Sequence, residues 1–139
     1  MIEVSVKYNG GMKVTGINTM NHETQFDSHP DGGGENSAPT PMEVMLESLA
    51  ACTYMDVISI IRKKRRTVND LVVHAQGERA EKHPKVYTKV HLIYELHSQD
   101  AEASDLERAV QLSESTYCSA IGLFKKAGVE ITHESKIIK

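Results

Sequence analysis

The stretch that decides the fold is residues 40–57, TPMEVMLESLAACTYMDV, which sets a cysteine, Cys52, inside a long apolar helix. Apolar side chains recur at helical spacing as far as Ile61, so we expect the helix to run to about Lys63 or Lys64. Most faces of this helix are apolar. We therefore predict that it lies at the centre of the molecule and is wrapped by other elements.

Both ends of this helix carry recognisable signals. Thr40 can cap its start, Pro41 stands where a missing N–H costs nothing, and Glu43 completes a capping box with Thr40. The other end runs into five cations at residues 62–66, which suit the negative end of the helix dipole. We favour a solvated helix end for this basic run over a nucleic-acid patch, because the chain as a whole is acidic.

The rest of the chain reads as strands and helices of ordinary length. The expected elements are strands at 2–8, 12–17, 22–27, 67–79, 85–97 and 129–138, helices at 101–115 and 117–127, a turn at 9–11 and a loop rich in proline and glycine at 28–41. In the strand at 85–97, one face is expected to hold Val86, Thr88, Val90, Leu92, Tyr94 and Leu96. Hairpin-connected strands with helices on one side predict an α+β fold, and 139 residues suit one domain, residues 1–139.

The composition is that of an ordinary globular protein, 40% hydrophobic and 25% charged, with a formal net charge of −3 and a pI of about 6.1. This balance gives no reason to expect a nucleic-acid partner. No apolar run approaches the roughly 18 residues that a membrane span needs, and residues 1–8 alternate like a strand instead of forming a signal sequence. We therefore expect a cytoplasmic protein without a membrane partner.

Two cysteines are present, Cys52 and Cys118. A reducing cytosol disfavours a permanent structural disulfide, and two cysteines alone cannot make a four-ligand zinc site, so composition alone favours two unrelated buried thiols. Cys118 falls near the start of a short helix, a position that lowers a thiol pKa, whereas Cys52 lies too deep in its helix to benefit. Asp56, one turn after Cys52, would raise the pKa of that thiol if it is ionised.

Segment 40–57 has a proline, an acidic residue, a leucine-rich turn and small residues before Cys52, and in this it resembles the first cysteine helix of the OsmC/Ohr family. Residues 115–119, STYCS, resemble the second cysteine motif of that family, and the strand expected at 129–138 follows as it does there. Both motifs occur in order with two long strands between them. The resemblance therefore covers nearly the whole chain, and it looks most like the YhfA-like branch.

The resemblance implies antiparallel strands around a central cysteine-bearing helix, in an intertwined homodimer with active sites at the subunit interface. It also implies thiol-dependent reduction of an organic hydroperoxide, with no cofactor and no metal. Cys52 would attack the peroxide as a thiolate and become a sulfenic acid, and Cys118 would resolve it to a disulfide. An external thiol, such as a dihydrolipoyl group, would then reset the pair.

Two positions depart from the peroxidases of that family. Their activating arginine lies in the N-terminal hairpin, but here no arginine precedes Arg62 and the hairpin offers only Lys7 and Lys13. The glutamate that orients the arginine aligns with Met42, so Glu43, the weakest catalytic candidate, lies one position away. These departures favour an alternative, a non-enzymatic OsmC-like protein that binds a small apolar ligand.

Histidine offers a further alternative, because a Cys–His pair would make a nucleophile of another class. The seven histidines are His22, His29, His74, His83, His91, His97 and His133. No two of them form a recognisable metal-ligand motif. Only His22, shortly before the loop that leads into the cysteine helix, stands out slightly by position.

Overall fold

The computed structural model describes all residues, Met1–Lys139, and they divide into two compact units, Met1–Met45 and Leu46–Lys139. The long helix α1 (Pro41–Lys63) begins in the first unit and continues through the second. Its start is as predicted: the Thr40 N–H donates to Glu43 Oε1 at 3.0 Å, and the Glu43 N–H donates to Thr40 Oγ1 at 3.3 Å. The assignment of residues 1–139 to a single domain stays a prediction.

The first unit is a three-stranded antiparallel sheet followed by a loop. Its strands are β1 (Val4–Tyr8), β2 (Val14–Asn18) and β3 (Glu23–Phe26), paired in the order β1-β2-β3. Gly10 and Gly11 turn the first hairpin with φ angles of 91° and 56°, which glycine adopts without strain. The predicted strands and turn are confirmed, with ends that differ by one or two residues, and the loop contains a 3₁₀ turn, η1 (Pro30–Gly32).

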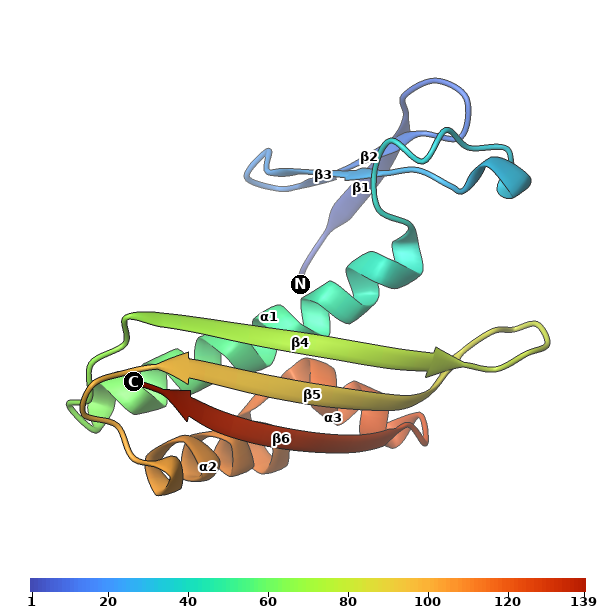
Figure 1. Cartoon of the computed structure of the whole chain (residues 1–139). Coiled ribbons are helices and arrows are strands. Elements are labelled where there is room, and N and C mark those ends of the chain that lie inside the picture. The colour runs from blue at the N-terminus through green and yellow to red at the C-terminus, as the bar shows by residue number, and fades with distance from the viewer. The chain divides into compact units, whose positions relative to one another are not determined.

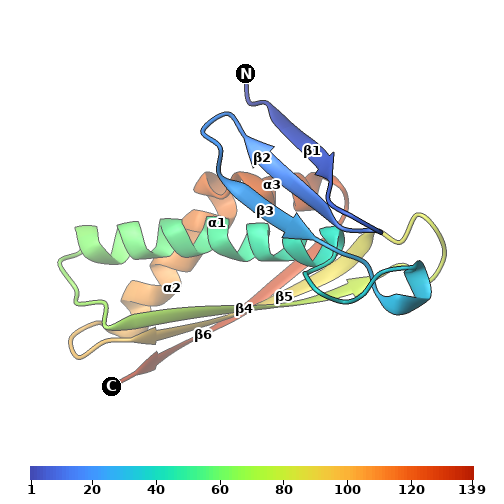
Figure 2. The same ribbon diagram turned by 90° about the horizontal axis from the view of Figure 1, so that it is seen from above.

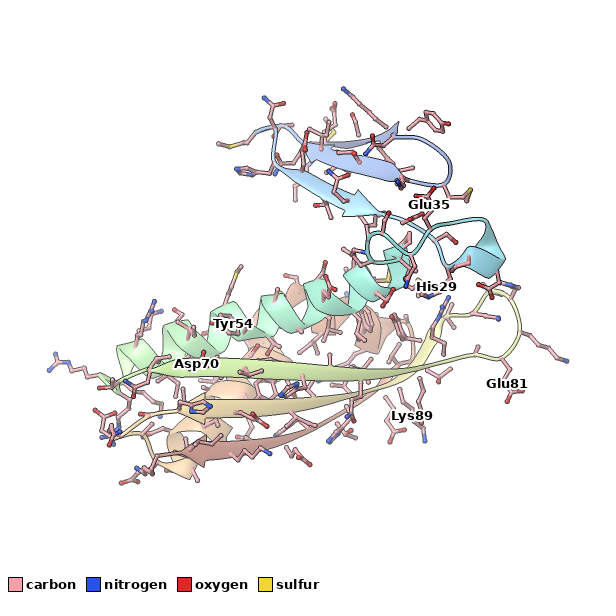
Figure 3. All side chains as sticks on the ribbon, turned by 45° about the horizontal axis from the view of Figure 1, so that its top comes forward. His29, Glu35, Tyr54, Asp70, Glu81 and Lys89 are labelled. Carbon is pink, nitrogen blue, oxygen red and sulfur yellow. The ribbon has the colours of Figure 1, made fainter.

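Asp27, at the end of β3, organises the loop that follows. Its Oδ1 accepts the Ser28 N–H at 2.7 Å, and its Oδ2 accepts the Glu35 N–H at 3.2 Å and both the N–H and the hydroxyl of Ser37, at 3.1 and 2.7 Å. The hydrogen bonds from Ser37, with those from the backbone of Ser28 and Glu35, hold the pKa of Asp27 well below its usual range. A carboxylate that accepts so many bonds fixes the two ends of the loop together (Figure 3 labels Glu35 and His29 in it).

Replacing Asp27 with asparagine is expected to loosen this loop, because an amide offers one acceptor oxygen in place of two. In the wild-type protein the folded-state pKa of Asp27 is depressed, so its stabilising contribution is present above the unfolded pKa and is lost as the pH falls through the folded value. We expect faster amide hydrogen exchange at Glu35 and Ser37 in Asp27→Asn near neutral pH. Unchanged exchange at both amides would contradict this role.

The second unit packs three helices on one face of a sheet (Figures 1 and 2). The sheet has the order β4-β5-β6, with β4 (Asp70–Arg79), β5 (Tyr87–His97) and β6 (Glu130–Ile138). The helices are the continuation of α1, α2 (Ala103–Leu112) and α3 (Ser119–Lys126), and a π-helical turn, η2 (Ser113–Tyr117), joins the last two. Helices gathered on one face of the sheet confirm the predicted α+β class.

The prediction of antiparallel strands is wrong for one pair. β4 and β5 form an antiparallel hairpin, but β5 and β6 run parallel, with Tyr94 opposite Ser135. The connection between them contains α2, η2 and α3, which carry the chain back along the sheet so that β6 starts at the same end as β5 (Figure 1). Parallel neighbours need such a crossover.

The core of the second unit lies between the sheet and the helices. From β5 it takes Val90, Leu92, Tyr94 and Leu96, each at most 1% exposed, and from α1 it takes Leu49, Thr53, Val57 and Ile61. The predicted grouping of alternate residues on one face of β5 is thus correct from Val90 onwards, where this face is buried, but wrong at its start, where Val86 and Thr88 are exposed and Tyr87 is buried. A β-bulge beside Glu78 shifts the register there, so Tyr87 turns inward and stacks on Phe124 with ring centroids 5.7 Å apart.

The prediction of a fully wrapped central helix is not confirmed for α1. One face is buried, but the other side exposes Ala51 and Met55. By length and composition alone α1 could cross a membrane. The prediction that no segment is long and apolar enough for this is therefore wrong. The core helix of a soluble protein passes the same test. The buried face of α1 carries the polar residue Thr53, which is hydrogen-bonded within the unit.

The basic run after α1 is partly neutralised within the unit. Arg66 Nε lies 2.9 Å from Asp105 Oδ2, and Lys64 Nζ lies 3.6 Å from Asp105 Oδ1. Arg65 turns the chain with a φ of 59°. The run therefore ends the helix and ties it to α2, a contact that the sequence did not predict, and the preference for a solvated helix end over a nucleic-acid patch stays a prediction.

Candidate active site

The structure brings Cys52 and Cys118 together. Cys52 lies in the middle of α1, and Cys118 is the N-cap of α3, where its Sγ accepts the Ile121 N–H at 3.4 Å. The two thiols are hydrogen-bond neighbours, and both cysteines are free. Residues far apart in the sequence thus form one dithiol site on the inner side of the second unit.

The expected lowering of the pKa of Cys118 by its helix start is not what the structure shows. The pKa of the Cys118 thiol is raised to about 12, mainly by burial and also by the neighbouring Cys52 thiol, and the bond from the Ile121 N–H offsets only part of this rise. Cys118 is 5% exposed, whereas Cys52 is half-buried. Of the two thiols, Cys52 is therefore the accessible one.

A chain of buried hydroxyl groups links the elements that hold the two cysteines. Thr53, beside Cys52, places Oγ1 2.8 Å from the Tyr94 hydroxyl and 2.8 Å from Ser113 Oγ. The Ser113 hydroxyl donates to Asp56 Oδ2 at 2.8 Å, and the Ser113 carbonyl accepts the Cys118 N–H at 2.8 Å. These bonds fasten α1 to the turn that precedes Cys118.

The acceptor at the end of this chain sets the direction of its first bonds. The Ser113 hydroxyl donates its one proton to Asp56, so Thr53 donates to Ser113, and the Tyr94 hydroxyl holds its one proton between Thr53 Oγ1 at 2.8 Å and Glu114 Oε1 at 3.4 Å. Burial raises the pKa of Tyr94 well above its usual range, so its hydroxyl keeps the proton that this order requires. Asp56 is thus occupied by Ser113, a partner that sequence reasoning did not supply.

The other predicted site residues have structural partners in the first unit. Glu43 is bonded to Thr40 in the capping box, and this bond lowers the pKa of its carboxyl group. Lys13 pairs with Glu35 at 2.8 Å, and His22 Nδ1 lies 3.1 Å from the Asn18 amide. A catalytic role for Glu43 stays a prediction.

Sequence reasoning missed Thr53, Ser113 and Glu114 as residues around the dithiol, and it did not single out His133 among the seven histidines. The inward alternation of β5 could have placed Tyr94 near the cysteine helix, since it was expected on that face. No sequence pattern predicts a π-helical turn, so nothing in the sequence marked Ser113 and Glu114 as residues of the site.

The fold and the dithiol define a small α+β thiol protein with one cysteine on a long helix and one at the cap of a short helix. The family model for OsmC-like proteins matches residues 33–134, and the chain belongs to the OsmC-like family. The predicted resemblance is therefore confirmed.

Individual relatives agree with this assignment. Protein YhfA of Escherichia coli (strain K12) is 32% identical over 137 residues, which are 99% of this chain and 98% of YhfA. A hypothetical protein from Aquifex aeolicus VF5 shares 30% identity and a TM-score of 0.82, covering 100% of this chain and 98% of its own. An organic hydroperoxide resistance protein OsmC from Legionella pneumophila shares the fold at 13% identity and a TM-score of 0.70, over 98% of this chain and 96% of its own.

Proposed function

We propose that this chain reduces organic hydroperoxides by two-cysteine chemistry. The observation that carries the proposal is the adjacency of the Cys52 and Cys118 thiols, the first half-buried and the second buried. The name of the Legionella relative, an organic hydroperoxide resistance protein, supports the substrate class. A paired thiol needs no metal or organic cofactor for this reaction.

The proposed cycle balances with three reactants. The Cys52 thiolate attacks one peroxide oxygen, the O–O bond breaks, and the alkoxide leaves with a proton as an alcohol, so that Cys52 becomes a sulfenic acid. Cys118 then attacks the Cys52 sulfur and water leaves. An external dithiol, for which we propose a dihydrolipoyl group, reduces the resulting disulfide by thiol exchange.

The environment of Cys118 suits it to the second step. Its high pKa, set by burial and by the Cys52 thiol, keeps it protonated in the reduced protein, so it does not compete for the peroxide. In the proposed cycle Cys118 acts only after Cys52 has become a sulfenic acid, because the sulfur of a sulfenic acid is the electrophile that a neighbouring thiol can attack.

A turnover assay tests the proposal. Purified protein is mixed with reduced lipoamide and cumene hydroperoxide, and peroxide loss is followed against a Cys52→Ala control. We expect turnover in the wild-type protein that the control lacks. Equal rates for the two proteins would refute the peroxidase proposal.

A second candidate function is non-enzymatic binding of a small apolar ligand. It is favoured by the absence of any arginine before Arg62, so the N-terminal hairpin has no arginine that could activate Cys52. Lys13, one of the two lysines in that region, is already paired with Glu35. A family member that had lost the chemistry would keep the fold and react with hydroperoxide no faster than its Cys52→Ala variant.

The exposed side of α1 supports a homodimer. It forms a shallow, open depression lined by Tyr54, Met55, Ile58, Ser59, Arg62 and Lys63. Met55 is 69% exposed, and Leu123 on α3 is 70% exposed. We propose that a second copy of the chain covers this apolar face, since such a surface on a cytoplasmic protein needs a partner.

Introducing a charge at this surface is expected to break the dimer. Met55→Lys would place an ammonium group in the proposed interface, where burial without a partner is costly, and we expect a monomer by size exclusion at micromolar concentration. Lys89→Met, at an exposed position of β5, serves as the control and should leave the dimer intact. A wild-type monomer would contradict the dimer proposal.

The proposed setting is the cytoplasm, because the pair must be returned to the thiol state. We propose neither a nucleic-acid nor a membrane partner. The contacts of Asp105 with Lys64 and Arg66 support the first statement, since they reduce the free charge of the basic run. Failure to bind DNA or RNA at low salt is the expected result.

A further inference from the structure

A histidine held between two glutamates lies beside the turn that precedes the second cysteine. His133, on β6, places Nδ1 3.1 Å from Glu114 Oε2 and Nε2 2.9 Å from Glu107 Oε1. Glu107 belongs to α2 and Glu114 to η2. The side chains of His133 and Glu114 are 20% and 11% exposed, so this contact is largely shielded from water. The three residues join a strand, a helix and the π-helical turn.

His133 can donate a hydrogen bond to both glutamates only if its imidazole is protonated. A neutral imidazole carries one N–H, whereas both ring nitrogens of His133 face a carboxylate oxygen. Burial lowers the pKa of His133, but the hydrogen bonds and charges of Glu107 and Glu114 outweigh it, and the pKa is raised overall. The imidazolium then donates to both carboxylates.

Other polar groups around the cluster hold the two glutamates in place. From β6, the Ser135 hydroxyl donates to Glu107 at 2.9 Å, and from α3 the Lys125 ammonium donates to the Glu114 carbonyl at 3.1 Å. From β5, the Tyr94 ring meets His133 edge-on with centroids 6.2 Å apart, and its hydroxyl lies 3.4 Å from Glu114 Oε1. These contacts leave His133 as the one group that binds both glutamates.

The cluster acts on the dithiol through η2. Glu114 is the second residue of this turn, and the Cys118 N–H closes the turn on the Ser113 carbonyl at 2.8 Å. π-helical turns are rare and are frequently found at functional sites. Contacts that fix the position of Glu114 therefore also fix the backbone that places Cys118 next to Cys52.

We propose that His133 is a positioning residue for the dithiol: by binding Glu114 and Glu107 together, it keeps η2 in the geometry that sets Cys118 against Cys52. The consequence for turnover rests on the proposed peroxidase function. The consequence for closing the Cys52–Cys118 disulfide rests on geometry alone and can be measured without a peroxide.

The sign of the pH dependence follows from the raised pKa of His133. The stabilising contribution of the imidazolium is fully present below the ordinary histidine value of about 6.5 and is lost as the pH rises through the folded-state pKa. The pKa of Glu107 is lowered by its bond to His133, so its contribution is lost only as the pH falls through that lowered value. Positioning by His133 is therefore strongest in mildly acidic solution.

The test measures how readily the disulfide closes in glutathione redox buffers. Two thiols and one oxidised glutathione give the protein disulfide and two reduced glutathiones, so the equilibrium reports the effective concentration of Cys118 at Cys52. We expect His133→Gln to lower this effective concentration roughly tenfold at pH 6, since a small misplacement of reacting groups is enough for that. The difference from the wild-type protein should shrink toward alkaline pH.

Two further variants make the result specific. Glu114→Gln leaves His133 and Glu107 in place but removes the carboxylate through which His133 holds η2, and it should show the same loss. His91→Gln is the control, because His91 bonds Thr132 at 2.7 Å on the same sheet, apart from the cluster around His133, and it should match the wild-type protein. Circular dichroism confirms that each variant is folded.

The outcomes separate this inference from the proposed peroxidase function. If His133→Gln and Glu114→Gln both close the disulfide as readily as the wild-type protein, the positioning role is overturned, even if the wild-type protein reduces hydroperoxide. Loss of closure in these two variants would support it even if the wild-type protein fails to reduce hydroperoxide. A wild-type protein that forms no Cys52–Cys118 disulfide in the oxidising buffers would overturn it as well.

Discussion

Cys52→Ser is expected to lower hydroperoxide turnover about a thousand-fold or more, to the level of the uncatalysed reaction with the reductant. Serine keeps the size of the side chain but cannot supply a thiolate at neutral pH, and the remaining thiol, Cys118, is buried with a pKa of about 12. Initial rates of peroxide loss at saturating reduced lipoamide measure the effect. A variant with more than a tenth of the wild-type rate would show that Cys52 is not the nucleophile.

Cys118→Ser is the matched variant for the second step. It keeps the half-buried Cys52, so the first oxidation should proceed and stop at the sulfenic acid. A sulfenate-trapping reagent should label this variant after a single dose of peroxide and should not label Cys52→Ser. Equal labelling of the two variants would contradict the assigned order of attack.

Thr53→Val is expected to lower the free energy of unfolding by about 2 kcal/mol, the largest stability effect among the variants considered, because it removes a buried hydroxyl and both of its hydrogen bonds. Valine keeps the shape of the side chain at a position that is fully buried. Tyr94 and Ser113 each lose a hydrogen bond of 2.8 Å. Chemical denaturation of the variant and the wild-type protein in the same buffer gives the difference.

Thr53→Ser separates the hydroxyl from the packing. It keeps the oxygen that bridges Tyr94 and Ser113 and loses a single methyl group, so its cost should be clearly smaller. If serine and valine destabilise equally, the hydrogen-bonded chain contributes little and packing alone explains the effect.

The sequence predicted α1 well because its signals are local. Thr40, Pro41 and Glu43 mark its start within four residues, and the structure contains the capping box that they form. The hairpins were equally accessible, since glycines and charged loops lie between alternating runs. The two cysteines emerged as candidates from motif resemblance, and the structure places them side by side.

The remaining features depend on tertiary structure. The parallel pairing of β5 with β6 follows from the crossover through α2 and α3, and no residue in either strand specifies it. Tyr87 turns inward because of a bulge in β5, where Thr88 has no partner between the pairs Glu78–Lys89 and Arg79–Tyr87. The high pKa of Cys118 reflects burial, which overrides the local effect of the helix start on which the sequence argument relied.

The residues around the dithiol show the same limit. Ser113 and Asp56 are 57 positions apart, and His133 meets Glu107 from 26 positions away. Serine, threonine and glutamate are also common on surfaces, so their identity alone gives no signal. Only the packing of α1, η2 and β6 in one unit reveals that they form a connected set.

The central claim, that Cys52 and Cys118 form a working redox pair, is tested most directly by intact mass after one equivalent of cumene hydroperoxide. The account predicts a rapid loss of two hydrogens in the wild-type protein, no loss in Cys52→Ser and a trappable sulfenic acid in Cys118→Ser. Unreacted thiols in the wild-type protein would contradict it, and would indicate that this chain keeps the OsmC-like fold without the peroxidase chemistry.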